Sequence, residues 1–466
     1  MIKIIKTSFL MCFVFLLTSC EDFLEVEAPD HKIISASVFN NEETAQSAMT
    51  GIYNELFRAS FSGGGENSVH VLAGLSSDEL KAIRANDLSL SEFAENAIQP
   101  ANERNLSHWA SAYSIIYMSN SLLEGLEASQ GISQNIKENL EGESKFMRAF
   151  TYFYLINLYG EVPLITTTNY AVNALASQAN IDEIYQQIID DLSDSVSLLG
   201  VTYHENDRIN VTRYAAMALL ARVHLYLENW AEAERLSSEV LSATGTYEIL
   251  SDLDQVFLAN SREAIWQISP IGGSGGVFTF TNEASTFIFH PFFPSINKIA
   301  LRMELVNSFG EEDNRFEHWI GFHERTGNYQ AFKYKDRSSM KNITEYSMVL
   351  RLAEQYLIRA EALTMQGKLS EAIADLDVIR ERAGLDLIAN ANIDIDREML
   401  IELILEERKK ELFTEWGHRW LDLKRTGMAS SILANKPSEW ENTDELFPIP
   451  AQERMKDPNL NQNPGY

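Results

Sequence analysis

The sequence predicts an all-α, mainly helical protein built from four tetratricopeptide-like helical hairpins with loop-rich insertions. Apolar residues recur at helical spacing in several segments, glycines end the predicted helices, and pairs of alanines share one spacing across a turn. A single hairpin cannot cover its own apolar face, so such hairpins usually stack in threes or more. The predicted frame is therefore a stacked array of hairpins.

The clearest hairpin spans 348–385. Apolar Leu352, Tyr356, Ala360 and Leu363 fall at steps of four, four and three, so they lie on one face of a helix. A Gly-Lys pair interrupts this pattern, which then restarts on a second apolar face and stops at a glycine. We therefore predict two helices folded back on each other.

A second hairpin repeats the same small-residue spacing. Ala360 and Ala372 are twelve residues apart and straddle the turn of the first hairpin, and Ala221 and Ala233 do the same in 214–245. Small side chains at these positions let two helices cross closely. The repeated spacing indicates that the two segments are copies of one unit.

Two further hairpins are predicted with interruptions. A helix over 136–159 is expected to pair with one over 181–199 after an insertion, and a helix over 41–58 with one over 107–126 across a longer insertion. We therefore expect 41–466 to form one domain, a hairpin scaffold with variable ligand-binding insertions at about 60–105 and 270–345.

Composition excludes one class of partner. The chain has 466 residues, 45% of them hydrophobic, and a formal net charge of −29. Such a chain buries a sizeable core. Because an acidic balance of this size repels phosphate backbones, we expect no nucleic-acid partner.

The first residues predict a lipoprotein signal peptide over 1–19. Two lysines precede an unbroken apolar run over 9–17, which is too short for a bilayer that needs about 20 helical residues. The run closes on Leu-Thr-Ser-Cys, the pattern of a bacterial lipobox. We therefore expect cleavage before Cys20, lipidation of its thiol, and a membrane tether over 20–40.

Several short stretches occur in a specific order. They are KFMRAF and YGEVPL within 145–164, RLAE and IRAEA within 351–362, EERKKEL at 406–412, RWLDLKR at 419–425, LFPIP at 446–450 and QNPGY at 462–466. In these stretches, and over essentially the whole mature chain, the sequence resembles the SusD/RagB family of outer-membrane nutrient-binding lipoproteins.

The resemblance implies both a fold and a function. The implied fold is the SusD-like one, four tetratricopeptide-like hairpins that carry a loop-rich region. The implied function is non-enzymatic: a lipid-anchored protein on the outer face of the outer membrane captures an oligosaccharide and passes it to a SusC-like TonB-dependent transporter. No cofactor or metal is implied.

An aromatic-rich segment between the third and fourth hairpins is the candidate ligand site. Sugar binders place aromatic faces against the apolar faces of sugar rings and use polar side chains for the hydroxyls. From this segment we select Phe289, His290, Phe292, Phe293 and Trp319 as candidate ligand-binding residues.

The insertion before the 107–126 helix supplies further candidates. In starch-binding members of the family an aromatic residue and an Asn in this stretch help to form the ligand site, whereas here amides and charges dominate and Phe93 is the only ring. We select Asn102, Arg104 and, as a possible rim group, Asp78. This departure argues against starch itself and suits another glycan or a peptide.

Other functions remain open from the sequence. The same architecture capturing peptides is the main alternative, and a surface glycoside hydrolase or a pure protein-binding scaffold is a further one. Carboxylates are plentiful, but a glycosidase needs two of them facing each other at about 5–9.5 Å, which spacing along the chain does not reveal. Histidines form no HExxH motif or close metal pair.

Overall fold

A computed structural model describes residues 38–84, 86–270, 279–338, 340, 342–390, 394–434, 436 and 440–466. The predicted signal peptide, Cys20 and most of the predicted tether lie outside these residues. No helix in the described ranges has both the length and the hydropathy to cross a bilayer. The description below therefore concerns the predicted domain of 41–466.

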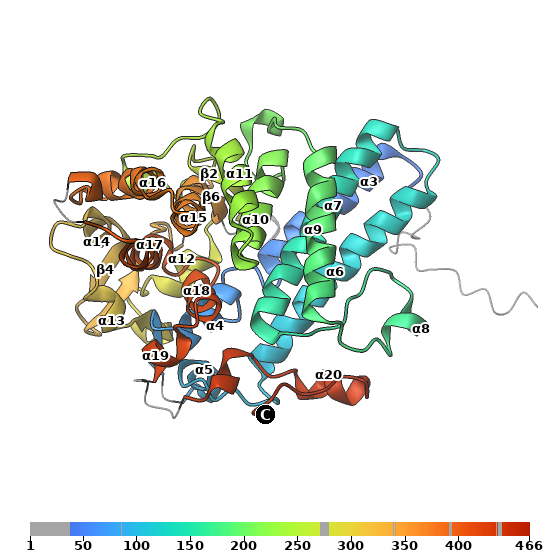
Figure 1. The fold of residues 1–466 in the computed structure, drawn as a ribbon. Coiled ribbons are helices and arrows are strands. Elements are labelled where there is room, and N and C mark those ends of the chain that lie inside the picture. Colours follow the sequence, from blue (N-terminus) through green and yellow to red (C-terminus); the bar gives the residue numbers. More distant parts are fainter. Residues whose placement is uncertain are drawn as a thin grey trace, which may run out of the picture.

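Four pairs of helices form the frame, which confirms the predicted fold class. Figure 1 shows them succeeding one another from right to left, each packed against the next. The pairs are α3 (Glu42–Arg58) with α6 (Glu103–Ala128), α7 (Gln134–Tyr159) with α9 (Ile181–Leu198), α10 (Arg213–Tyr226) with α11 (Trp230–Leu241), and α15 (Leu352–Met365) with α16 (Leu369–Arg382).

Small residues lie where the helices approach one another most closely. Ala221, Ala233, Ala360 and Ala372 are fully buried, as the spacing across the turns predicted. At Gly142 of α7 a Cβ atom would lie only 2.9 Å from Leu199, at the end of α9. A larger side chain at these positions would therefore push paired helices apart.

The structure also contains short strands, and one of them corrects a predicted boundary. Residues 348–351 belong to β6 (Ser347–Arg351), which pairs antiparallel with β2 (Ala264–Ile268), and are not the start of a helix. Both strands are buried throughout, so they carry no polar alternation that would mark them as strands. The helix of this hairpin begins at Leu352.

Two further strand pairs lie in the insertions. β1 (Leu80–Ala82) pairs antiparallel with β3 (Ile299–Leu301), and β4 (Ile320–His323) pairs antiparallel with β5 (Asn328–Ala331). The first pair joins two segments that are more than two hundred residues apart in the chain. It is one of the contacts that bring the two predicted insertions together, with the ion pair of Lys298 with Glu66 and the hydrogen bond from Asn282 to the Gly63 carbonyl among the others.

The remaining elements cover the frame and its insertions. They are α4 (Val69–Ser76), α5 (Leu88–Ala94), α8 (Tyr170–Asn173), η2 (His204–Asn206), η3 (Leu253–Gln255), α12 (Asn282–Phe287), η5 (Pro294–Ile296), α13 (Met303–Val306), α14 (Asn314–Trp319), η6 (Ile388–Asn390), α17 (Arg397–Leu412), α18 (His418–Arg425), α19 (Ala429–Leu433), η7 (Asn442–Glu445) and α20 (Ala451–Lys456).

An aromatic cluster forms the centre of the core. The ring centroid of Phe150 on α7 lies 5.2 Å from that of Trp266 on β2 and 5.1 Å from that of Trp416, both in edge-to-face geometry. Tyr154 lies 5.2 Å from the same phenylalanine. Such pairs add about 0.5–1.5 kcal/mol each beyond the area they bury. The cluster therefore ties the second hairpin to the β2–β6 ribbon and to the chain that precedes α18.

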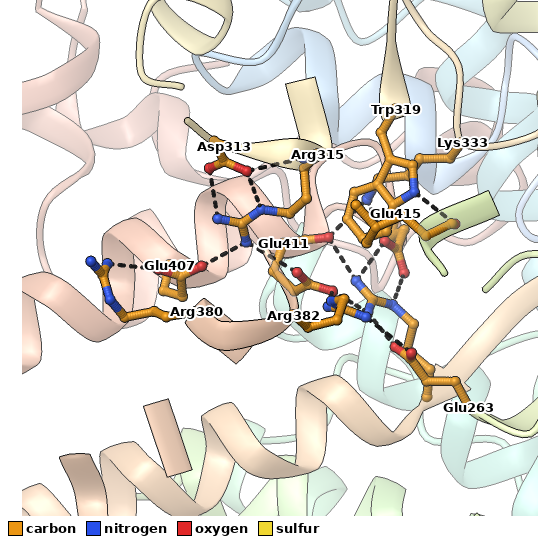
Figure 2. A network of polar contacts seen from close by, with 12 residues as sticks. Glu263, Asp313, Arg315, Trp319, Lys333, Arg380, Arg382, Glu407, Glu411 and Glu415 are labelled. Atoms are coloured by element: carbon orange, nitrogen blue, oxygen red, sulfur yellow. Dashed lines mark hydrogen bonds and ion pairs between the residues drawn. The ribbon is translucent and has the colours of Figure 1, made fainter. Parts of the chain in front are cut away.

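A buried ionic network joins the second insertion to α17 and to the fourth hairpin (Figure 2). It has as many carboxylates as cations, and each group contacts at least one partner of opposite charge: Glu263, Asp313, Glu407, Glu411 and Glu415 with Arg315, Lys333, Arg351, Arg380 and Arg382. Because the charges balance inside the network, their burial is tolerated.

Candidate functional site

The two insertions meet at the β1–β3 ladder and form a groove beside it. Beyond the ladder the Ile83 N–H donates to the Lys298 carbonyl at 2.8 Å, so the two chains continue side by side. The groove encloses about 680 Å³. Its lining is Arg84, Asn86, Asp87, Leu88, Ser89, Ser295, Ile296 and Lys298.

An exposed aromatic loop forms one edge of this groove. Phe292 is 75% exposed and Phe293 64% exposed, and Ile296, which also lines the groove, is 54% exposed. Most aromatic rings in the described part of the chain are buried. Two adjacent exposed phenylalanines therefore distinguish this surface. We call the segment that carries them, residues 291–296, the Phe292–Phe293 loop.

Hydrogen bonds hold this loop in place from within. The Nδ1 atom of His290 accepts from the backbone N–H groups of Phe292 at 3.2 Å and Phe293 at 3.0 Å. Asn297, which is buried, accepts from the His290 N–H at 2.8 Å and donates to the Ile288 carbonyl at 3.0 Å. The rings therefore point outward from a fixed backbone.

Two arginines hold the ends of the loop. The Arg84 guanidinium donates to the carbonyl of Asn297 at 3.2 Å and to that of Ser295. Arg325, in the turn between β4 and β5, donates to the carbonyls of Pro291 at 3.2 Å and Phe292 at 3.4 Å. The loop thus lies between two cationic side chains.

Opposite charges cross-link the floor of the groove. The Nζ atom of Lys298 lies 2.8 Å from Glu66 and 3.1 Å from Asp87, and Arg104 lies 2.9 Å from Asp87 and 3.3 Å from Glu66. Burial raises the pKa of Asp87, but hydrogen bonds from Ser89 and Lys298 and the charge of Arg104 lower it by more. Asp87 is therefore ionised at neutral pH.

The structure brings together four of the candidate residues from the sequence. His290, Phe292 and Phe293 form the aromatic loop, with the His290 ring 5.2 Å from that of Phe293. Arg104 lies behind the groove, in the charged floor, and lines a second hollow of about 220 Å³. Asn102 is the N-cap of α6: its side-chain oxygen accepts from the N–H groups of residues 104 and 105, and it is buried.

Three other candidates serve the interior of the protein. Asp78 forms a two-pronged ion pair with Arg419 at 2.7 and 2.9 Å, Phe289 stacks on His323 and is 3% exposed, and Trp319 is fully buried. The Trp319 indole donates to the Leu253 carbonyl at 3.1 Å. These side chains do not reach a ligand on the loop surface, which corrects the placement expected for them.

Sequence reasoning selected none of the residues that line the groove. Arg84 and Lys298 come from different insertions, which lie side by side through the β1–β3 pairing, and a pairing between distant segments leaves no local signal. Two lining residues are large apolar side chains at the end of a short helix: Leu88 begins α5 and is 70% exposed, and Ile296 ends η5 and is 54% exposed. No group of three or more His, Cys, Asp or Glu side chains placed to hold a metal ion occurs among the described residues.

A hairpin frame that presents exposed aromatic rings beside a polar groove has the two kinds of surface that sites for small ligands combine. Residues 22–225 match a family model described as starch-binding and associating with the outer membrane, and residues 317–466 match the SusD family model. The chain belongs to the SusD/RagB family, whose members are binding proteins and not enzymes.

Known proteins agree with this assignment over nearly the full length. SusD-like protein P25 of Formosa agariphila is 24% identical, over 98% of both chains. A SusD superfamily protein of Bacteroides vulgatus superimposes with a TM-score of 0.79 at 22% identity, over 92% of this chain and all of that one. A laminarin-binding SusD-like protein gives a TM-score of 0.76 at 25% identity, over 92% of this chain and all of that one.

Proposed function

We propose that this protein captures an oligosaccharide on the Phe292–Phe293 loop and the adjoining groove, and delivers it to a TonB-dependent outer-membrane transporter. The observation that carries the proposal is the pair of exposed phenylalanine rings on a loop fixed by His290 and Asn297. A relative described as laminarin-binding and a family model described as starch-binding support the ligand class.

The two exposed rings contribute little to the stability of the fold. Burying a phenylalanine side chain is worth about 1.5–3 kcal/mol, and neither ring takes that gain. Their backbone is held by hydrogen bonds, so a ligand that covers the rings does not also have to order the loop. This arrangement suits a ligand with flat apolar faces, such as the faces of a sugar ring.

The groove supplies the polar half of such a site. Asn86, Ser89 and Ser295 offer donors and acceptors for sugar hydroxyls, and Asp87 is a strong acceptor. The lowered pKa of Asp87 is the reverse of what a general acid in glycoside hydrolysis needs. The site is therefore suited to binding and not to cleavage.

The proposed location is the outer membrane. Support comes from the family description and from the lipobox that ends at Cys20, which would carry the lipid anchor. Replacing Cys20 with Ser should release the protein from membranes into the soluble fraction. Co-purification of the anchored protein with a SusC-like transporter is the corresponding test of the partner.

The ligand proposal is tested with the mature chain carrying Cys20→Ser. Affinity electrophoresis against a glycan panel identifies the ligand, and titration calorimetry then compares variants. The double variant Phe292→Ala/Phe293→Ala should lower affinity at least about tenfold, which is 1.4 kcal/mol. Tyr170→Ala is the matched control, because Tyr170 is an aromatic residue on α8 that is 83% exposed and lies outside the groove.

Three outcomes would overturn the proposal. The first is unchanged glycan affinity in the double variant. The second is binding of oligopeptides without binding of any glycan, which would favour the peptide-capturing alternative. The third is release of reducing ends from a polysaccharide by the purified protein, which would indicate a hydrolase.

A further inference from the structure

We propose that the oligosaccharide bound at this site is anionic, and that carboxylate or sulfate groups on its sugar units pair with Arg84 and Arg325 while a sugar ring covers Phe292 or Phe293. The inference rests on the proposed function of the site and specifies its substrate class. It follows from where the structure gathers uncompensated positive charge.

The loop surface has the opposite charge balance to the whole chain. The chain carries a formal net charge of −29, yet residues 288–298, which include the aromatic loop, contain no Asp or Glu. The groove beside the loop is lined by two cations, Arg84 and Lys298, and by one carboxylate, Asp87. Its nearest neighbours in the floor, Arg104 and Glu66, cancel one another.

Both arginines are bonded only to neutral groups. Arg84 donates to two backbone carbonyls and Arg325 to two others, and no carboxylate of the described residues lies within ion-pair distance of either guanidinium. A carbonyl orients a guanidinium without removing its charge. By contrast, Lys298 and Arg104 share their charges with Glu66 and Asp87.

Each arginine also has N–H donors that are not used in these carbonyl contacts. A guanidinium has five N–H donors in a planar fork, and the carbonyl contacts use the Nε and one Nη of Arg84 and a single Nη of Arg325. The remaining donors can form the two-pronged hydrogen bonds that arginine makes with carboxylate, and that match the oxygens of a sulfate ester equally well.

The two cations flank the rings. Arg84 contacts the backbone at residues 295 and 297, after the phenylalanines, and Arg325 contacts it at 291 and 292, before and at the first of them. A sugar stacked on these rings would therefore lie on a loop that has an arginine bonded to each of its ends. At physiological salt the Debye length is about 8 Å, so acidic groups elsewhere on the chain are screened from the ligand while these contacts are not.

The experiment compares ligands of one length. Calorimetry on the mature chain with Cys20→Ser uses a neutral laminarihexaose, a hexagalacturonate, a sulfated hexasaccharide and a hexaglutamate peptide. We expect at least one anionic hexasaccharide to bind at least tenfold tighter than the neutral one, and hexaglutamate to bind more weakly than that anionic sugar. The carboxylated and sulfated arms show which group the site selects.

Variants then separate charge from loop positioning. Arg325→Gln and Arg84→Gln should each weaken binding of the anionic sugar about five- to tenfold. Because both arginines also donate to carbonyls of the loop, the neutral sugar reports the loss that comes from loop positioning alone, and we expect that loss to be under about twofold. Arg84→Lys, which keeps the charge, should lose less than Arg84→Gln. Arg235→Gln is the control, since Arg235 on α11 is 52% exposed and paired with Glu232 and Glu239.

The results distinguish the inference from the function on which it rests. A neutral hexasaccharide that binds as tightly as both anionic ones, with loss in Phe292→Ala/Phe293→Ala, would overturn the anionic ligand and support glycan capture. Absence of binding to any glycan would overturn both. Equal binding of hexaglutamate and the anionic sugars would also overturn the inference, because it would show recognition of charge without sugar.

Discussion

Removing one charge from the buried ionic network should destabilise the protein far more than removing a charge from the surface of the same helix. The substitution is Glu411→Gln, near the end of α17. The carboxylate of Glu411 lies at the centre of the network in Figure 2: it contacts Arg351 at 2.5 Å, Arg315 at 3.1 Å and also Arg382.

The expected cost follows from these contacts. Glutamine keeps the shape and one acceptor oxygen, but its amide group turns two donors toward the arginines, and the network is left with one net positive charge. A hydrogen bond to a charged group contributes about 1.5–3 kcal/mol, and breaking a buried ion pair typically costs about 3–5 kcal/mol. We expect a loss in the free energy of unfolding of about 3–5 kcal/mol.

Urea unfolding followed by tryptophan fluorescence measures this cost, with Glu406→Gln as the control. Glu406 lies on the same helix, is 43% exposed and faces Lys410 at 3.6 Å, so its loss should cost less than about 1 kcal/mol. Equal losses in the two variants would refute the reasoning, because they would show that the buried network adds no more than a surface pair.

Three further predictions follow from single contacts. Gly64→Ala should lower the free energy of unfolding by at least about 1–3 kcal/mol, because Gly64 has φ +74° and an added Cβ would lie 2.2 Å from the side chain of Glu283. Gly65→Ala is the control: an added Cβ meets no atom within 4 Å there, so the free energy of unfolding should change by under about 0.5 kcal/mol. Burial raises the pKa of the Glu411 carboxyl, but three arginines and a lysine lower it well below 4.5. As the pH falls, this carboxyl is therefore protonated in the unfolded chain before it is protonated in the folded one, so its contribution to the free energy of unfolding is present above about pH 4.5 and is lost below it. Unfolding titrations between about pH 5 and 3 should show a shallower loss of stability in Glu411→Gln than in the unmodified protein. Trp319→Phe should cost about 1–3 kcal/mol by losing its buried hydrogen bond and leave glycan affinity unchanged, as calorimetry would show.

The frame was predictable from sequence because its signals are local. Leu352, Ala360 and Leu363 repeat at the helical period, and Ala360 with Ala372 marks a close crossing within one hairpin. The β2–β6 ribbon was missed because both strands are buried on both faces and carry no alternation. The β1–β3 pair was missed because its partners are far apart in the chain.

The aromatic residues show the same limit at the site. The sequence places Phe292, Phe293 and Trp319 in one ring-rich segment and gives no period that separates exposed rings from buried ones. Their local settings do differ. The two phenylalanines lie between Pro291 and Pro294, which prevents regular backbone pairing and favours a surface loop, whereas Trp319 ends α14 and packs beneath Lys333.

The carboxylate of Asp78 shows a related limit, since a carboxylate in an insertion is equally able to bind a ligand or to fix the insertion. Asp78 does the latter. Its ion pair with Arg419 attaches the first insertion to α18, and burial raises its pKa while Arg419 and Lys409 lower it by more, so the pair is charged at neutral pH. Only the partner, 341 residues away, decides between the two roles.

The same contacts explain how an exposed loop is held in a fixed position. Arg419 anchors the first insertion through Asp78, and Glu411 and Glu415 anchor the second insertion through its Arg315 and Lys333. The β1–β3 ladder then fixes the insertions to each other. Because these attachments lie beneath the surface, the exposed side chains of 291–296 contribute little to them. Substitutions of those side chains should therefore alter ligand binding while leaving the free energy of unfolding nearly unchanged. This independence of binding from stability is what a site needs if one frame is to serve many ligands.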